Sequence, residues 1–134
     1  MSRIVGIDFG LKRIGVAVSD AMRKIALPLG TAEGGRNGIQ NVMALLAGRQ
    51  ILAIVIGLPV TLKGERGEMV KKVEEFGTAL GQALDAPVIY VDERLSSAAA
   101  DRSLREISLN RRERSQKIDV TAATMMLQSY LDSL

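Results

Sequence analysis

Residues 51–58, ILAIVIGL, form an apolar run in which polar residues do not alternate. A strand with one face in water alternates apolar and polar side chains, whereas a strand covered on both faces reads as continuously apolar. The run therefore predicts a strand of the parallel type, covered on both faces. Residues 37–49 before it and 68–84 after it carry apolar residues at helical spacing, which predicts two amphipathic helices.

The beginning of the chain has the opposite pattern, because residues 3–9 and 13–19 both alternate. In the first segment Val5, Ile7 and Phe9 share one face, and the other face carries Ile4, Gly6 and Asp8. A short turn with Gly10 joins the two segments, which predicts an antiparallel hairpin. Residues 25–32 are expected to form a third strand, and Pro28 places it near a sheet edge.

The remaining segments complete a mixed sheet. Residues 86–93, APVIYVDE, predict a further short strand, and helical spacing returns at 96–106 and again at 116–133. The order is a hairpin or meander, then α-β-α-β, then helices. It predicts an α/β fold whose sheet is antiparallel at its start and parallel afterwards. The 134 residues, of which 47% are hydrophobic, fit a single domain spanning 1–134.

Two missing residue types narrow the chemistry, because the chain has no cysteine and no histidine. Without cysteine there are no disulfides, thiolate metal ligands or cysteine nucleophiles. Without histidine the chain lacks the commonest general base and the usual zinc ligand.

Charge and hydropathy suggest where the protein works. The longest apolar run, 51–60, is about half of what a membrane-spanning helix needs, and charges interrupt the first twenty residues, unlike in a signal peptide. We therefore expect a cytoplasmic protein without membrane association. Residues 101–117 hold six basic and three acidic residues. Such a cluster can bind phosphate, although charge alone favours a solvated loop.

Acidic residues stand at three places where pure structure does not require them: Asp8 within a strand, Asp92 and Glu93 at a strand end, and Asp119 on the apolar face of the final helix. Each has an ordinary explanation: a turn cap, a polar strand end, or a favourable helix dipole. If strands one and five are neighbours, however, the acids converge at one sheet edge under the final helix. Strand alternation leaves the choice between Asp92 and Glu93 open.

A cluster of carboxylates repels itself unless a cation neutralises it. With only hard oxygen ligands available, such a site selects Mg²⁺ or Mn²⁺. Pairs of these ions stabilise the attacking and leaving oxygens of phosphodiester cleavage. The acids therefore indicate a metal-dependent nuclease that needs no histidine.

Four motifs in order closely resemble the YqgF, or RuvX, family of bacterial RNase H-like proteins. They are DFGLKRIGVAVSD at 8–20, GLP with a following glycine at 57–64, DERLSS at 92–97 and KIDVTAATMMLQSYL at 117–131. The resemblance spans essentially the whole chain. It implies an RNase H-like fold with a mixed five-stranded sheet, and activity as a Holliday-junction resolvase or as a nuclease that matures the 5′ end of pre-16S rRNA.

The resemblance also implies residue roles. By motif position the catalytic and metal-binding acids are Asp8, Glu93 and Asp119, so the resemblance favours Glu93 over Asp92. The residues expected to contact nucleic-acid phosphates are Lys12, Arg13, Arg94 and, from the basic cluster, Lys117. DERLSS has serines where threonines are usual, and Val60 and Thr61 replace the usual Leu and Asn, so these two are assigned no role. We further interpret Gly6 and Gly10 as clearance for the substrate backbone.

Three function classes remain in view. The first is a Mg²⁺- or Mn²⁺-dependent endonuclease on precursor rRNA or branched DNA, and the second is a binding module of the same fold that does not cut. The third is an ATPase, since GIDFG is similar to the first phosphate motif of actin- and Hsp70-like enzymes. Those enzymes need two such domains, which 134 residues cannot hold. The sequence does not distinguish RNA from DNA, or a monomer from a homodimer.

Overall fold

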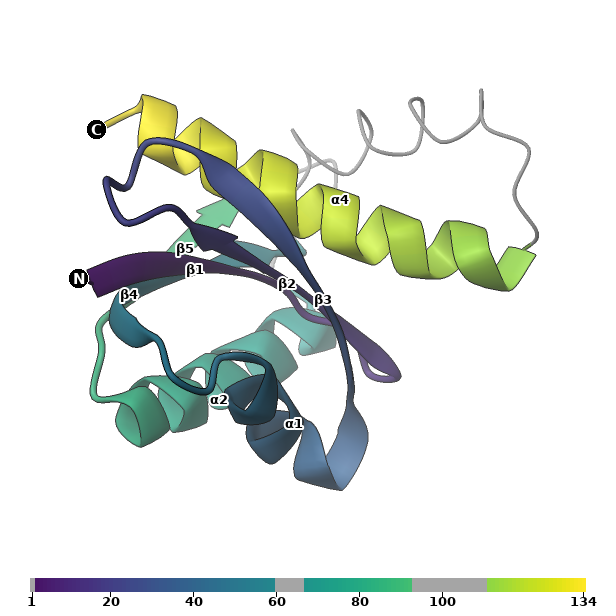
Figure 1. The fold of residues 1–134 in the computed structure, drawn as a ribbon. Helices are drawn as coiled ribbons and strands as arrows, with labels where there is room; N and C mark the ends of the chain where they lie inside the picture. Colours follow the sequence, from purple (N-terminus) through teal and green to yellow (C-terminus); the bar gives the residue numbers. More distant parts are fainter. Residues whose placement is uncertain (1, 60–66, 93–110) are drawn as a thin grey trace.

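The computed structural model describes residues 2–59, 67–92 and 111–134. One five-stranded sheet runs in the order β3-β2-β1-β4-β5 (Figure 1). Its strands are β1 (Ser2–Asp8), β2 (Arg13–Ser19), β3 (Ala26–Glu33), β4 (Gln50–Leu58) and β5 (Val88–Asp92). β1, β2 and β3 pair antiparallel, whereas β4 pairs parallel with both β1 and β5. The predicted mixed sheet is confirmed.

Helices cover both faces of this sheet. A 3-10 turn η1 (Gly35–Asn37), α1 (Gly38–Leu45) and α2 (Glu68–Leu84) lie on one face, and the long α4 (Arg111–Asp132) crosses the other (Figure 1). Two apolar clusters match these layers. Val5, Ile7, Ile54 and Ile56 belong to the cluster that includes α1 and α2, and Ile4, Ala53 and Val55 belong to the α4 cluster. The non-alternating run at 51–58 is thus apolar because both faces of β4 are buried.

Element boundaries differ from the expectations at several ends. α1 stops at Leu45 rather than 49, and Gly48 follows with φ of 84°, a left-handed conformation that does not continue a helix. α4 begins at Arg111 rather than 116. β3 is an edge strand as Pro28 predicted, and its pairing with β2 shifts register between Val16 and Ala17. The expected helix at 96–106 lies outside the described residues.

Within the described part of the chain, no helix is both long enough and apolar enough to span a bilayer.

Candidate active site

Asp8 is the last residue of β1 and points to the α4 side of the sheet. The strand alternates, with Val5 and Ile7 in the α1–α2 cluster and Ile4 in the α4 cluster, so Asp8 falls on the same face as Ile4. On β2 its paired residue is Gly15. The carboxylate is partly exposed rather than buried. It therefore lies at a sheet edge where α4 can bring a second group near it.

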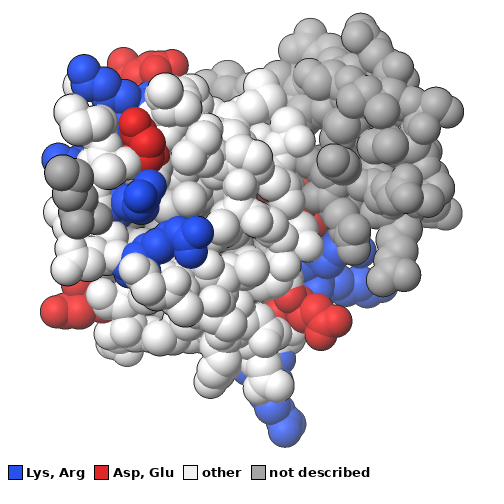
Figure 2. Space-filling view, viewed as in Figure 1, with Lys and Arg blue, Asp and Glu red and all other residues white. Residues whose placement is uncertain are grey.

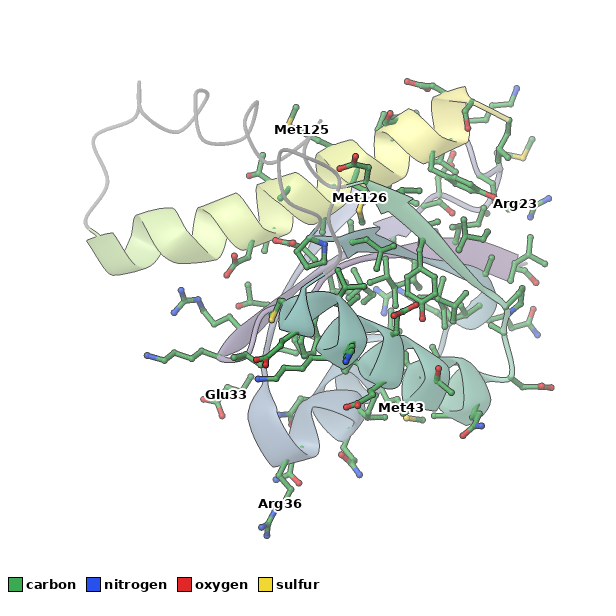
Figure 3. All side chains as sticks on the ribbon, turned by 180° about the vertical axis from the view of Figure 1, so that it is seen from behind. Arg23, Glu33, Arg36, Met43, Met125 and Met126 are labelled. Carbon is green, nitrogen blue, oxygen red and sulfur yellow. The ribbon has the colours of Figure 1, made fainter. Side chains whose placement is uncertain are left out.

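Asp119 approaches from α4 above the same pair of strands. A side chain on Gly15 would collide with the Asp119 backbone carbonyl, so the helix and β2 touch at this point. Further along α4, Ala122, Ala123 and Met126 are buried against the sheet. Figure 3 shows Met126 directed toward the sheet and its neighbour Met125 directed away from it. The predicted apolar face of the final helix, with Asp119 on it, is confirmed.

Two glycines have a different role from the one expected. A Cβ on Gly6 would lie 2.8 Å from the Leu127 Cβ and 3.0 Å from the Ala123 carbonyl oxygen. A Cβ on Gly10 would lie 2.5 Å from the Arg13 carbonyl oxygen. Both spaces are filled by the protein itself, so the expectation that these glycines make room for substrate backbone is wrong. Gly6 admits α4, and Gly10 admits the tight turn between β1 and β2.

Arg13, the first residue of β2, forms an ion pair with Asp119. Its Nε donates to Asp119 Oδ2 at 3.1 Å, and the two residues are 106 positions apart in the chain. Arg13 lies two residues before Gly15 and therefore on the same face of β2. The close contact of Gly15 with α4 thus explains why the guanidinium and the carboxylate meet.

The environment of Asp119 acts on its protonation in two directions. Burial of the side chain raises the pKa of the Asp119 carboxyl above its ordinary value of 3.8, and the hydrogen bond and charge of Arg13 partly oppose this rise. Desolvation disfavours the charged form of an acid, whereas a neighbouring cation favours it. Arg13 therefore helps to keep a half-buried carboxylate ionised.

The end of β5 lies at the same sheet edge but not beside β1. Because β4 separates the two strands, the condition that strands one and five are neighbours is wrong. Parallel pairing of β1 with β4 and of β4 with β5 still brings their carboxyl ends to one edge. Two interstrand spacings, roughly 10 Å, therefore separate the β1 and β5 backbones at this edge.

Asp92, the last residue of β5, pairs with Leu58 of β4. It also lines a hollow of about 340 Å³ with Val91 and with Met125 and Met126 of α4. Glu93 and Arg94 lie outside the described residues, and so does the side chain of Lys117. The described residues contain no group of three acids close enough to hold a metal ion, which leaves the predicted set of Asp8, Glu93 and Asp119 a prediction.

A polar groove opens next to Arg13. It measures about 370 Å³ and is lined by the β1–β2 turn and the end of β3, namely Leu11, Lys12, Arg13, Thr31, Ala32, Glu33 and Gly34. Lys12 is exposed on this turn, and Glu33 at the end of β3 is labelled in Figure 3. Arg13 therefore contacts Asp119 and also lines this groove.

Comparison with known proteins identifies the family. The family model described as "RuvX: Holliday junction resolvase" matches residues 2–133. The chain belongs to the RuvX family. The RuvX relatives include a protein from Protochlamydia amoebophila, 43% identical over 98% of this chain and 94% of its own. Another, from Chloroflexus aurantiacus, is 42% identical over 97% of this chain and 86% of its own. Both relatives carry the name "Putative pre-16S rRNA nuclease".

Solved structures support the RNase H-like fold of this RuvX chain. The fowlpox virus Holliday junction resolvase matches with a TM-score of 0.59 and 16% identity, over 98% of this chain and 99% of that one. Thermus thermophilus RuvC in complex with a Holliday junction matches with a TM-score of 0.57 and 13% identity, over 99% and 95%. At such identities the likeness concerns the fold, and the family match makes the RuvX protein a nuclease.

One relationship in this RuvX site was missed by the sequence. Arg13 was assigned to phosphate, and its ion pair with Asp119 was not expected. The available signal was parity on β2, since Arg13 and Gly15 share a face and a glycine on a strand often marks a close backbone approach. The final helix was expected over this sheet edge, but the sequence did not place Asp119 against β2.

Proposed function

We propose that this protein is a divalent-metal-dependent endonuclease of structured nucleic acid, in which Asp8, Glu93 and Asp119 form the catalytic acid set. The observation that carries the proposal is the meeting of β1, β2 and α4: Asp8 pairs with Gly15, and Gly15 contacts the Asp119 backbone. This arrangement supports a site at one edge of the sheet to which two acids from opposite ends of the chain contribute. In the sequence Glu93 directly follows Asp92, which ends β5 at the same edge.

The donors suit Mg²⁺ or Mn²⁺. Asp8 and Asp119 offer carboxylate oxygens, and the chain has neither histidine nor cysteine to favour a softer ion. Half-buried Asp119 is ionised with the help of Arg13, and an ionised oxygen is the form that binds such a cation. When bound, divalent ions of this kind supply an activated water and stabilise charge on the phosphate.

The protein's own residues then position the substrate. Lys12 and Arg13 border the groove beside the acids, and we propose that they contact backbone phosphates together with Arg94 and Lys117. Phosphate contacts fix the register of a nucleic acid without reading its sequence. In this proposal the acidic side chains would bind the cations and the basic side chains would bind the nucleic-acid strand. Together they would position one phosphodiester beside the carboxylates.

Precursor 16S rRNA is the substrate favoured by the names of the relatives, and four-way DNA junctions are favoured by the family description. Both substrates are found in the bacterial cytoplasm, where we place the protein. Symmetric junction cleavage needs two sites related by a two-fold axis, so it would require a homodimer, whereas trimming of rRNA would not.

Replacement of Asp8 tests the proposal. Asp8→Asn keeps the shape of the side chain and removes its charge. We expect cleavage with Mg²⁺ or Mn²⁺ to fall by roughly two to three orders of magnitude, while the melting temperature stays close to wild type. The assay compares four-way junction DNA with a precursor 16S rRNA fragment, in product gels for both proteins.

The matched control is Asp85→Asn, at the far end of α2. Asp85 has φ of 51°, a conformation that asparagine also tolerates, so this variant should cut as wild type does. Cleavage by pure Asp8→Asn at the wild-type rate would contradict the proposed role of the acid. Tight binding by the wild type without product under any divalent ion would instead establish the binding module.

A further inference from the structure

Arg13 lies between the Asp119 carboxylate and the polar groove. On one side its Nε donates to Asp119 Oδ2 at 3.1 Å. On the other side Arg13 lines the groove with Lys12 and Thr31. Its side chain is 38% exposed, whereas that of Asp119 is 24% exposed. The arginine is therefore the more exposed partner of this ion pair.

A divalent ion at Asp119 would compete with this ion pair. Both cations would seek the same carboxylate, and like charges a few ångströms apart repel strongly where water is partly excluded. Among the described residues, Arg13 is the cation that forms an ion pair with Asp119. It thus already satisfies the carboxylate to which the proposed ion would bind.

We propose that Arg13 is a switching residue: it neutralises Asp119 before the divalent ion binds, and it turns to a substrate phosphate in the groove once the ion has bound. This inference rests on the proposed function, because it takes Asp119 as a metal ligand. The bond to Asp119 uses Nε, and within the described part of the chain no hydrogen bond engages the terminal guanidinium nitrogens. An arginine fork suits phosphate as well as carboxylate.

The switch couples two binding events. Binding of the metal ion would release the Arg13 guanidinium, which could then contact nucleic acid. Binding of nucleic acid would in turn move the guanidinium away from Asp119, where the ion binds. Thermodynamic linkage requires the two effects to have the same size. Arg13 would therefore be a positioning residue that makes metal and substrate bind together rather than independently.

The first experiment measures Mn²⁺ binding to the protein alone by calorimetry. We expect Arg13→Gln to bind Mn²⁺ roughly tenfold more tightly than wild type, because the competing cation is gone. Arg13→Lys keeps the charge but not the fork, so it should fall between the two. The matched control is Lys12→Gln, which removes the same charge from the same groove without touching Asp119 and should stay within about twofold of wild type.

The second experiment measures binding to junction DNA with Mn²⁺ and with a chelator, and it is read before turnover, at a time when product gels show the DNA still uncut. Metal should increase the DNA affinity of wild type by a factor that shrinks by roughly threefold to tenfold in Arg13→Gln. Lys12→Gln should weaken DNA binding equally with and without metal. Melting curves establish that each variant is folded.

The outcomes separate the two proposals. Weaker Mn²⁺ binding by Arg13→Gln would mean that Arg13 orients the carboxylate for the ion, and this would overturn the switch. Unchanged Mn²⁺ binding by both Arg13 variants would overturn it as well. If Asp119→Asn leaves Mn²⁺ affinity unchanged, the proposed function itself fails at that residue, whatever the Arg13 variants do.

Discussion

Asp119 is subject to two opposing influences, since burial penalises its charge and Arg13 compensates for only part of that penalty. The pKa of the carboxyl in the folded protein is raised above 3.8, with desolvation as the larger cause. An acid with a raised pKa favours folding when it is protonated. Its contribution is therefore fully present below the unfolded pKa and is lost as the pH rises through the folded pKa.

Replacing the acid with its amide should for this reason stabilise the metal-free fold. We expect Asp119→Asn in a chelator to have a higher urea midpoint than wild type at pH 7.5, and the gap should close as the pH falls toward about 4. Urea titrations at several pH values check this. An equal or lower midpoint at pH 7.5 would show that the ion pair with Arg13 outweighs the burial.

For single residues, the sequence predicted the strand face of a side chain better than its interaction partner. The period of two along residues 3–9 placed Asp8 on the face opposite Val5 and Ile7, and the structure agrees. The partner of Arg13 lies 106 residues away, so no local pattern could supply it. The choice of Glu93 over Asp92 came from resemblance, and it remains a prediction.

Among the elements, α4 packs closely on the sheet because glycines lie beneath it. Gly15 faces the Asp119 carbonyl and Gly6 faces Leu127, so the helix lies closer to β1 and β2 than any larger residue would allow. Leu127 is fully buried at this contact. The same closeness sets the backbone of Asp119 against Gly15, the residue of β2 that pairs with Asp8.

A methyl group at Gly15 should displace the helix. Gly15→Ala would place a Cβ against the Asp119 backbone. Because this neighbour is backbone, β2 or α4 would have to shift to make room. Overpacking of this kind costs roughly 1–3 kcal/mol, and we expect cleavage to fall further than the loss of folded protein explains. Urea unfolding and a cleavage assay on the same sample separate the two effects.

Gly67→Ala provides a comparison, because a Cβ there meets no described residue within 4 Å. It should change stability by no more than about 1 kcal/mol, the size of a helix-cap effect, and leave cleavage unchanged. A Gly15→Ala protein as stable and active as this control would contradict the close-packing explanation.

Periodicity identified the elements because their faces differ in exposure. Residues 51–58 lack alternation since both faces of β4 are buried, and residues 68–84 matched α2 to the residue. Order within the sheet was less accessible. β4 lies between β1 and β5, an order that no residue pattern in the sequence indicated.

For the whole molecule, the net charge is small and the described basic side chains are interspersed with acidic ones. The net charge is +3, and on the described part of the face in Figure 2 lysines and arginines form separate groups with acids among them. Among the described residues on this face no single basic surface dominates (Figure 2). Because the net charge is only +3, we expect attraction to nucleic acid to come from localised contacts near the acids rather than from the overall field.

The salt dependence of binding tests this view. If Lys12, Arg13, Arg94 and Lys117 each contact one phosphate, log affinity for junction DNA should fall with log salt at a slope of roughly −3 to −4. Lys12→Gln should lower the magnitude of the slope by about 1. Arg36→Gln, on the exposed turn η1 that points away from the sheet in Figure 3, should leave it unchanged. Equal slopes for all three proteins would refute the localised contacts.

The packing of α4 on Gly6 and Gly15 also has a consequence for folding. Contacts between distant parts of a chain form late, because a long loop must close before they stabilise anything. Arg13 and Asp119 meet across 106 residues, so a chain still emerging from the ribosome has the hairpin but not the helix over it. We therefore expect the proposed acid set to be assembled only after the final helix has packed on the sheet, so that the nascent chain does not cleave nucleic acid.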